Sequence, residues 1–431
     1  MTPTASSIVS NTSREQRARQ REAELTERYT NSRALFERAT KVVPGGGHLS
    51  GKPLVDTRTT PLYFERGAGA TLHDVDGHGY TDYLLAFGAV LLGYARPEVD
   101  AAANLQLARG SLLSLNHPLH VELVERLLPR LPGAEMGIFL KSGSEATTAA
   151  LRIARHYTGR RAIARAGYHG WHDWCLPLEG FVPGGLDSQV LEYRATDPDS
   201  LAGLFAAYPH DIAAVILAPE MVLPFDPATI HELMRITREH GALFVMDEVK
   251  TGLRISPGSV CARIDLAPDL ITVSKALGNG WPVAVTAGAR RIMAGAAGMH
   301  YSATFHGDTA AMAAALKTIE LVEQEGVQVR VERLGQRLID GLNGLVRDLG
   351  VPALAYPEPL AAMPFFRFTH PDARQNALLT TWFYREALAR GQLLHPRHLW
   401  FVSGAHGEAD IDQTLRACHS ALLETLSLVS V

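Results

Sequence analysis

The sequence has little of what marks secreted, membrane-spanning or nucleic-acid-binding proteins. Its three cysteines, Cys175, Cys261 and Cys418, are too far apart for a disulfide framework or a CxxC pair, which favours a reducing compartment. No apolar run reaches the roughly 18 residues that cross a bilayer. The formal net charge is only -4, and no basic run is interleaved with aromatic residues. We therefore expect a cytoplasmic protein without a membrane or nucleic-acid partner.

Lysine is scarce as well. Only six of the 41 basic residues are lysines, and they stand at positions 41, 52, 141, 250, 275 and 317. A lysine at the end of an apolar strand loses its proton more readily, because burial disfavours the charged amine. Lys275 follows the apolar stretch 270–274 and precedes a glycine-rich turn. This position makes Lys275 a candidate for chemistry.

The middle of the chain alternates short apolar runs with helical patterns. Helical segments at 144–159 and 227–241 are long enough to cross from one parallel strand to the next. This alternation predicts an α/β fold with a mostly parallel sheet that is covered on both faces. Active sites in such sheets lie at the carboxyl ends of the strands. The predicted strands span residues 137–141, 161–166, 213–220, 242–248, 270–275 and 283–289.

The two ends of the chain differ from this middle part. At 431 residues the chain is long enough for two or three domains, and no internal repeat or long linker separates them. The polar start lacks the apolar core of a signal peptide, and its alternating Arg and Glu residues predict a solvated helix. We expect four segments: an N-terminal extension (1–30), the N-terminal part of a small α+β domain (31–75), a large domain (76–318) and the C-terminal part of the small domain (319–431).

A Ser142-Gly143-Ser144 turn joins a predicted strand to a predicted helix. Such a turn suits a phosphate group, because backbone amides and the helix dipole face the anion and Gly143 allows close approach. Ser142 with Glu145 three residues later also forms the pattern of a helix capping box. Both interpretations stay open for this turn.

The segment "AGYHGWHDW" (166–174) follows another predicted strand. Tyr168 offers an aromatic face to a flat ring, and His169 offers a polar contact to its edge. His169 and His172 also suggest a metal site, but no third ligand stands at helical spacing, so we expect no metal.

Asp247 and Glu248 end an apolar strand in "LFVMDEVKTGLR". A buried carboxylate there needs a partner, such as a protonated nitrogen of a ligand, unless Asp247 caps a helix. Lys275 ends the next predicted strand, unless its amine reaches into solvent. A phosphate turn, an aromatic face, a carboxylate for a ring nitrogen and a lysine for an aldehyde together predict pyridoxal 5'-phosphate as the cofactor.

A nucleotide-binding or other regulatory α/β protein is the rival interpretation. It uses the Ser-Gly-Ser turn but leaves Lys275 and Asp247 without a role, and the chain lacks the glycine-rich dinucleotide fingerprint.

Six segments resemble, in order and spacing, the class III pyridoxal-phosphate aminotransferases. The segments "VVPGGG" and "GYHGWHD" are most similar to the glutamate-1-semialdehyde aminomutase subgroup. The resemblance covers about residues 35–425. It implies a fold type I transferase with a seven-stranded, mostly parallel sheet in the large domain. The six segments are "DVDGHGYTDY", "SGSEATTAALRIAR", "YHG", "MDEVKTGLR", "PDLITVSKALGNGWPV" and "ATFHGDTAAMAAAL".

The resemblance implies catalytic roles for Lys275 and Asp247. Lys275 would hold the cofactor as a Schiff base and carry a proton during transfer of an amino group between an amino acid or amine and a keto acid or aldehyde. Asp247 would pair with the pyridine nitrogen of the cofactor. The resemblance implies further cofactor contacts from Ser142, Gly143, Ser144, Tyr168, His169, Glu220, Val249 and Thr304.

Thr304 matches a threonine that reaches the phosphate from the neighbouring subunit, which implies a homodimer with shared active sites. Lys52 lies close to where the aminomutase pattern has an arginine that binds a carboxylate. A lysine attracts a carboxylate without the bidentate fork of arginine. An aminotransferase is therefore the main interpretation, and an intramolecular aminomutase of the glutamate-1-semialdehyde type is the alternative.

Overall fold

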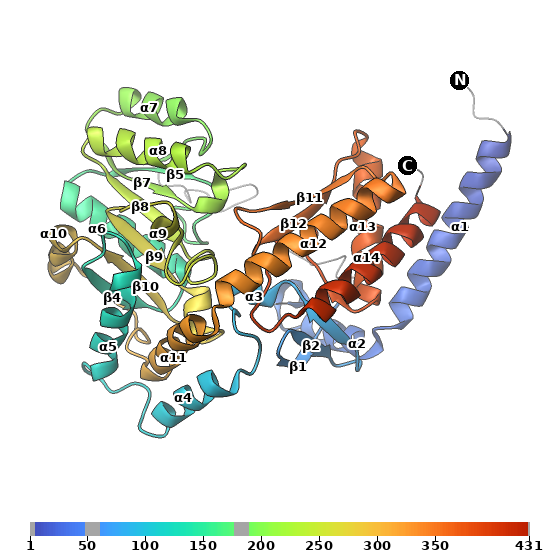
Figure 1. Cartoon of the computed structure of the whole chain (residues 1–431), viewed down its shortest axis with the longest axis horizontal. Helices are drawn as coiled ribbons and strands as arrows, with labels where there is room; N and C mark the ends of the chain where they lie inside the picture. Colours follow the sequence, from blue (N-terminus) through green and yellow to red (C-terminus); the bar gives the residue numbers. More distant parts are fainter. Residues whose placement is uncertain (1–4, 48–60, 176–188, 430–431) are drawn as a thin grey trace.

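A computed structural model describes residues 5–47, 61–175 and 189–429. Figure 1 shows two parts, one built around a large sheet and one in which long helices surround smaller sheets. Within the described ranges, no helix combines the length and apolar character needed to cross a bilayer.

The large sheet has seven strands in the order β4-β10-β9-β8-β7-β5-β6. Only β10 runs against its neighbours, so the other six strands point their carboxyl ends to the same edge. This arrangement confirms the predicted α/β fold with a mostly parallel sheet. The strands are β4 (Met136–Leu140), β5 (Ala162–Ala166), β6 (Val190–Glu192), β7 (Ile212–Leu217), β8 (Leu243–Glu248), β9 (Leu270–Val273) and β10 (Ala284–Gly288).

Every residue of the central strands β7, β8, β9 and β10 is buried, as expected for strands that helices cover on both faces. The helix α6 (Gly143–Thr158) packs across β7 to β10, and α8 (Pro227–Glu239) packs on β8. Asp226 begins α8 by accepting two backbone N–H bonds, with Pro227 in the first turn. Further helices of this part are α4 (Pro97–Leu107), α5 (Pro118–Leu127), α7 (Pro198–Ala207) and α11 (Thr309–Glu325).

The second part combines the two ends of the chain, as predicted. Its four-stranded sheet has the order β1-β2-β3-β13, and β13 from the C-terminal region pairs in parallel with β3. A hairpin of β11 and β12 packs on two long helices, α12 and α13. The elements are β1 (Phe64–Ala68), β2 (Thr71–Asp74), β3 (Gly79–Asp82), β11 (Ala353–Pro357), β12 (Pro364–Phe368), β13 (Gln392–Leu393), α12 (Val327–Leu349), α13 (Ala373–Ala389) and α14 (Glu408–Leu428).

Short helical turns join these elements: η1 (Pro44–Gly46), α3 (Leu85–Gly88), η2 (Leu128–Arg130), η3 (Pro219–Met221), α9 (Val260–Arg263), η4 (Lys275–Gly278), α10 (Arg290–Met293) and η5 (Ala294–Gly298).

The N-terminal region forms α1 (Ala5–Glu27) and α2 (Thr30–Ala39), and α1 runs beside α14 in Figure 1. The predicted helix is present, but it is not solvated all round. Leu25 is buried, and Arg21 Nε lies 2.8 Å from Oε1 of the buried Glu386. These contacts attach α1 to the C-terminal helices.

Two strand predictions differ from the structure. The strand β6 was not predicted, because it has only three residues and lies at the sheet edge. The strand predicted to end at residue 220 ends at Leu217, and a short helix begins at Pro219, which has no N–H for the sheet. The expected division at 75/76 separates β2 from β3 of one sheet, and the division at 318/319 falls inside α11.

Candidate active site

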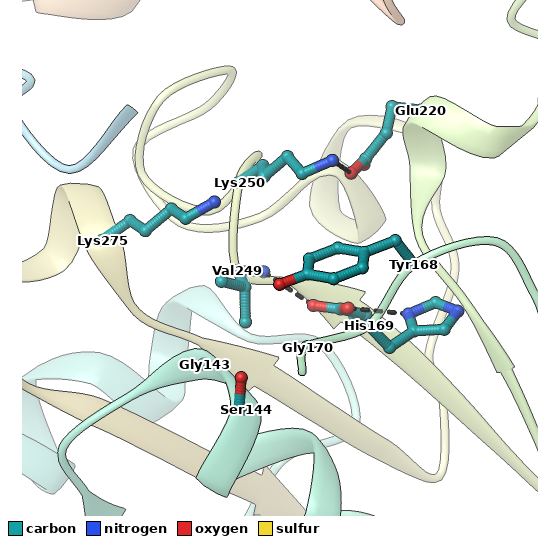
Figure 2. A pocket seen from close by; sticks show the side chains of 10 residues that line it. Gly143, Ser144, Tyr168, His169, Gly170, Glu220, Val249, Lys250 and Lys275 are labelled. Carbon is teal, nitrogen blue, oxygen red and sulfur yellow. Dashed lines mark hydrogen bonds and ion pairs between the residues drawn. The ribbon is translucent and has the colours of Figure 1, made fainter. Parts of the chain in front are cut away.

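A pocket lies at the carboxyl edge of the large sheet (Figure 2). Six parallel strands end at this edge, so residues that are far apart in sequence meet there. Segments after β4, β5, β7, β8 and β9 supply its walls. The residues that line it are Gly143, Ser144, Tyr168, His169, Gly170, Glu220, Asp247, Val249, Lys250 and Lys275.

Lys275 enters this pocket directly after β9. Its backbone is left-handed, with φ of 48°, a conformation that costs a non-glycine residue about 1 kcal/mol and is common at functional sites. Its side chain is partly exposed to the pocket and has no ion-pair or hydrogen-bond partner in the described ranges. Burial, together with the nearby Lys250 charge, lowers the pKa of Lys275 to about 7. A large fraction of Lys275 is therefore the neutral, nucleophilic amine at neutral pH.

Asp247 is the second-last residue of β8 and is held as a carboxylate. Burial by itself raises the pKa of Asp247, but the hydrogen bond and charge of His169, the Val249 N–H and the Lys250 charge together outweigh it, and the pKa is lowered. His169 Nδ1 lies 2.7 Å from Asp247 Oδ2, and the Val249 N–H donates to Asp247 Oδ1 over 3.0 Å. The other ring nitrogen of His169 lies 3.1 Å from the carbonyl oxygen of Ala166. The structure thus gives His169 a contact with Asp247 that the sequence did not indicate.

The Ser-Gly-Ser turn forms the start of α6, where backbone N–H groups lack helical partners. Gly143 and Ser144 line the pocket, but Ser142 does not. The Ser142 hydroxyl accepts the Glu145 N–H over 3.3 Å, and Glu145 accepts the Ser142 N–H over 2.8 Å. This is the capping box that the sequence also suggested, so the Ser142 side chain is used by the helix.

Two contacts show how closely the turn is surrounded. A Cβ atom at Gly143 would lie 2.6 Å from Val249 Cγ1, so only glycine fits there without a shift. A Cβ atom at Gly170 would lie 2.6 Å from Ser144 Oγ, and the left-handed φ of 125° also favours glycine. Gly170 was not predicted as a site residue, although "YHG" contains it.

Tyr168 is 44 % exposed, and its hydroxyl end points toward Val249 in Figure 2. Burial raises the pKa of Tyr168, so the phenol stays neutral at neutral pH. An exposed aromatic face at a pocket wall can stack on a flat ring.

Glu220 and Lys250 form an ion pair in the same pocket. Lys250 Nζ lies 2.7 Å from Glu220 Oε1, and Glu220 is 2 % exposed. The other oxygen, Oε2, is buried and has no hydrogen-bond partner among the described residues. Glu220 was predicted, but Lys250 was missed. The position of Lys250 two residues after the end of β8 was the available signal, since the neighbouring strand is followed by Lys275.

Two predicted residues lie elsewhere. Thr304 is exposed, is not part of this pocket and belongs to the segment between η5 and α11. Lys52 lies outside the described residues. In the described part of the chain, no three His, Cys, Asp or Glu side chains gather as metal ligands, and His172 Nδ1 instead lies 2.7 Å from the Thr148 hydroxyl.

Comparison with known proteins agrees with this geometry. The profile of the class-III aminotransferases matches residues 54–181 and 187–351, which is more than half of the chain. The chain belongs to the class-III aminotransferase family.

Three similar proteins illustrate the range of the family. The 3-aminobutyryl-CoA aminotransferase of Cloacimonas acidaminovorans is 32 % identical over 92 % of this chain and 98 % of that protein. The glutamate-1-semialdehyde 2,1-aminomutase of Chloroflexus aggregans is 35 % identical over 93 % of this chain and 99 % of that protein. The structure of the FumI protein of Sphingopyxis sp. MTA144, in its PLP form, matches with a TM-score of 0.86 and 30 % identity, covering 92 % of this chain and 97 % of that chain.

The protein is therefore a PLP-dependent enzyme of fold type I and a transferase of amino groups. The pocket fits this cofactor. Gly143 leaves no room for a side chain beside the turn, which suits a closely held anion, and the orphaned Glu220 Oε2 can accept a hydrogen bond from a bound group.

Proposed function

We propose that this enzyme moves an amino group between two separate small molecules, an amino acid or amine and a keto acid or aldehyde, and that Lys275 is the residue that bonds to PLP. The observation that carries the proposal is that one pocket contains both an amine and a carboxylate. Lys275 presents an amine that no described residue pairs with, and Asp247 presents a carboxylate that His169 holds in place.

The roles of the other residues follow from their positions. PLP supplies an aldehyde and a ring that withdraws electrons from the substrate carbon. Asp247 keeps the ring nitrogen protonated, because a charge-assisted pair is stronger than a neutral hydrogen bond. Gly143 and Ser144, which line the pocket at the start of α6, would hold the phosphate, while Val249 and Tyr168 would contact the ring.

Lys275 would have a second role in this chemistry. As a neutral amine at the pocket it would accept the proton that leaves the substrate carbon. A base works best when its pKa is close to the working pH, and the pKa of Lys275 is lowered to about 7.

Transfer between two molecules is favoured over intramolecular transfer by Lys52. An aminomutase must keep its intermediate bound until the nitrogen returns, which needs a firm contact at the far end of the substrate. A lysine near "GGGHLSGKP" is a point charge and gives less directional control than an arginine fork. The aminomutase remains the second candidate, because an aminomutase is among the relatives, at 35 % identity.

Isotope transfer separates these two functions. The purified enzyme is incubated with a ¹⁵N-labelled amino donor and an unlabelled carbonyl acceptor, and products are analysed by mass spectrometry. We expect the label in the acceptor and a stoichiometric keto acid or aldehyde from the donor. A label that stays on the donor's own carbon skeleton at a shifted position, without a free carbonyl product, identifies a mutase.

We also propose a homodimer in which Thr304 of one subunit reaches the phosphate in the other. Thr304 is exposed and lies outside its own pocket, and its neighbour Phe305 is 60 % exposed. A groove beside this segment is lined by Tyr301, His306 and Val121 of α5, among others. Exposed apolar side chains also stand at Leu105 and Leu107 of α4 and at Leu112, Leu113 and Leu115, in the segment that leads to the groove residues Asn116 and His117. Such a surface suits a second copy of this chain.

We infer that the enzyme works in the cytoplasm. Cys175, Cys261 and Cys418 are all free and buried, which agrees with a reducing compartment.

A further inference from the structure

Two lysines reach the pocket, although the whole chain contains only six. Lys250 follows β8 and Lys275 follows β9, and these strands are parallel neighbours that end at the same edge. Figure 2 shows both amines directed into the pocket. An aldehyde that enters therefore meets two primary amines, and only one of them can be the residue that bonds to it.

The surroundings distinguish the two amines. Lys250 Nζ lies 2.7 Å from Glu220 Oε1, and its side chain is 16 % exposed. Lys275 has no such partner within the described ranges. A carboxylate at hydrogen-bond distance stabilises an ammonium, whereas a nearby ammonium without its own carboxylate is destabilised by a like charge.

We propose that Lys250 is a positioning residue whose ammonium, held by Glu220, leaves aldehyde addition to Lys275 and favours the neutral amine of Lys275. This inference rests on the proposed function of Lys275 as the PLP-bonding residue. It assigns Lys250 a role through charge, not through contact with the reacting atoms.

The pKa directions agree with the geometry. Burial lowers the pKa of Lys250, but the charge and hydrogen bond of Glu220, together with the charges of Asp247 and Glu358, outweigh burial and raise it above its usual value. Burial and then the Lys250 charge lower the pKa of Lys275 to about 7. Lys250 is thus kept protonated, whereas Lys275 loses its proton more readily.

Other charged groups also face Lys275 and shift its pKa. Glu220 and Asp247 raise its pKa, and Arg254 lowers it. Burial lowers the pKa of Arg254 to about 9, so its guanidinium still carries charge at neutral pH. From the C-terminal part, His398 also faces the two lysines. Burial lowers the pKa of His398 to about 3, so it is neutral.

Glu358 acts on Lys250 from the segment between β11 and β12. Burial raises the pKa of Glu358, so the carboxyl is less readily ionised than usual. Of the cations that act on Lys275, Lys250 has a direct carboxylate partner in Glu220. One substitution at Lys250 removes its charge.

The covalent step is balanced without a further reactant. The lone pair of Lys275 Nζ forms a bond to the aldehyde carbon, and both amine protons leave with the aldehyde oxygen as water. Only the neutral amine has this lone pair, so the rate of addition follows the fraction of neutral Lys275.

The test measures addition by the full chain after removal of its cofactor. Wild type, Lys250→Met and Lys250→Arg are mixed with PLP between pH 5.5 and 9.5, and the rate is followed by visible absorbance. Lys317→Met is the matched control, because Lys317 pairs with Glu320 on α11 and is not part of this pocket. Borohydride reduction and peptide mass spectrometry then identify the lysine that carries the label.

We expect the wild-type rate to rise with a midpoint near pH 7, with the label on Lys275. Lys250→Met moves the midpoint upward, since the like charge is gone and Glu220 is left to attract the Lys275 ammonium. A rise of one unit lowers the neutral fraction at pH 7, and with it the rate, about fivefold. Lys250→Arg and Lys317→Met keep the wild-type midpoint.

An unchanged midpoint in Lys250→Met overturns the inference, as does an equal shift in Lys250→Arg. If Lys250→Met does not fold, a wild-type midpoint near that of an ordinary lysine overturns it instead. A wild-type label on Lys250 contradicts the proposed function itself, so the peptide map separates the two failures.

Discussion

His169 and Asp247 stand 78 residues apart in sequence, yet His169 Nδ1 lies 2.7 Å from Asp247 Oδ2 inside the pocket. The two residues end or follow different strands of the sheet, β5 and β8. Their contact lowers the pKa of a buried carboxyl that burial alone would raise, so Asp247 is ionised at neutral pH. The site can therefore hold a protonated ring nitrogen.

Replacing Asp247 with Asn should leave part of the cofactor bound but lower kcat/KM at least about a hundredfold. An amide cannot keep the ring nitrogen protonated, and breaking a buried charged pair costs about 3 to 5 kcal/mol. Steady-state kinetics and the cofactor absorbance measure both effects. Activity within about threefold of wild type would show that another acid acts. Glu248 is a poor substitute, because its carboxylate already accepts N–H bonds from Val260 and Cys261.

Lys275→Ala should abolish turnover and leave the fold intact. In the proposed function Lys275 supplies both the bond to the cofactor and the base, so its loss removes both. The left-handed backbone at this position disfavours lysine as well as alanine, so the substitution adds no new backbone strain. Circular dichroism checks the fold. In the wild type, borohydride should fix the cofactor on the peptide that contains Lys275, and label on Lys141 or Lys250 would overturn the assignment.

Because the pKa of Lys275 is lowered in the folded protein, the cofactor-free protein should become more stable as pH rises from 7 to 9. The folded pKa is about 7 and the ordinary value is 10.5, so the unfolded chain binds more protons in this range. Relative to Lys275→Met, the wild type should gain about 2 kcal/mol of unfolding free energy. Urea unfolding at the two pH values gives this difference, and equal pH dependence of both proteins contradicts the lowered pKa.

Gly143→Ala should weaken PLP binding about tenfold or more. The new Cβ atom would lie 2.6 Å from Val249 Cγ1, so either the Ser142-Gly143-Ser144 turn or the Val249 side chain has to move. Such a shift commonly costs about 1 to 3 kcal/mol. Gly203→Ala on α7 is the control, because no described atom outside the adjoining backbone of its own helix and its two chain neighbours lies within 4 Å of the place that the new Cβ would occupy. Fluorescence titration of the cofactor-free protein measures both affinities. Equal affinities for both variants argue against close packing at the turn.

Shared active sites can be tested by mixing two impaired chains. In a hybrid of Lys275→Ala and Thr304→Ala subunits, one site carries both defects and the other carries neither, if Thr304 acts across the interface. We expect activity above that of either variant alone after subunits are exchanged. A monomer at working concentration in sedimentation analysis contradicts the dimer.

Much of the fold was predictable from local patterns. Apolar runs that alternate with helical segments identified six of the seven strands of the large sheet, since burial on both faces leaves a continuous apolar run. Asp247 and Lys275 were found because each stands at the end of such a run, and the glycine-containing turns marked the segments around Gly143 and Tyr168. The fold and the cofactor followed from these signals, and the family followed from the resemblance of six segments to the class III aminotransferases.

Other features depended on tertiary structure. The sequence left the Ser142 hydroxyl two possible uses, and the structure assigned it to the cap of α6. It gave no sign that His169 orients Asp247 or that Lys250 pairs with Glu220. Those contacts join residues at or after the ends of β5, β7 and β8, and they exist because these three strands are consecutive in the sheet, with β7 in the middle. Periodicity along the chain specifies which segments become strands, whereas strand order is decided by the packing of the whole sheet and its helices.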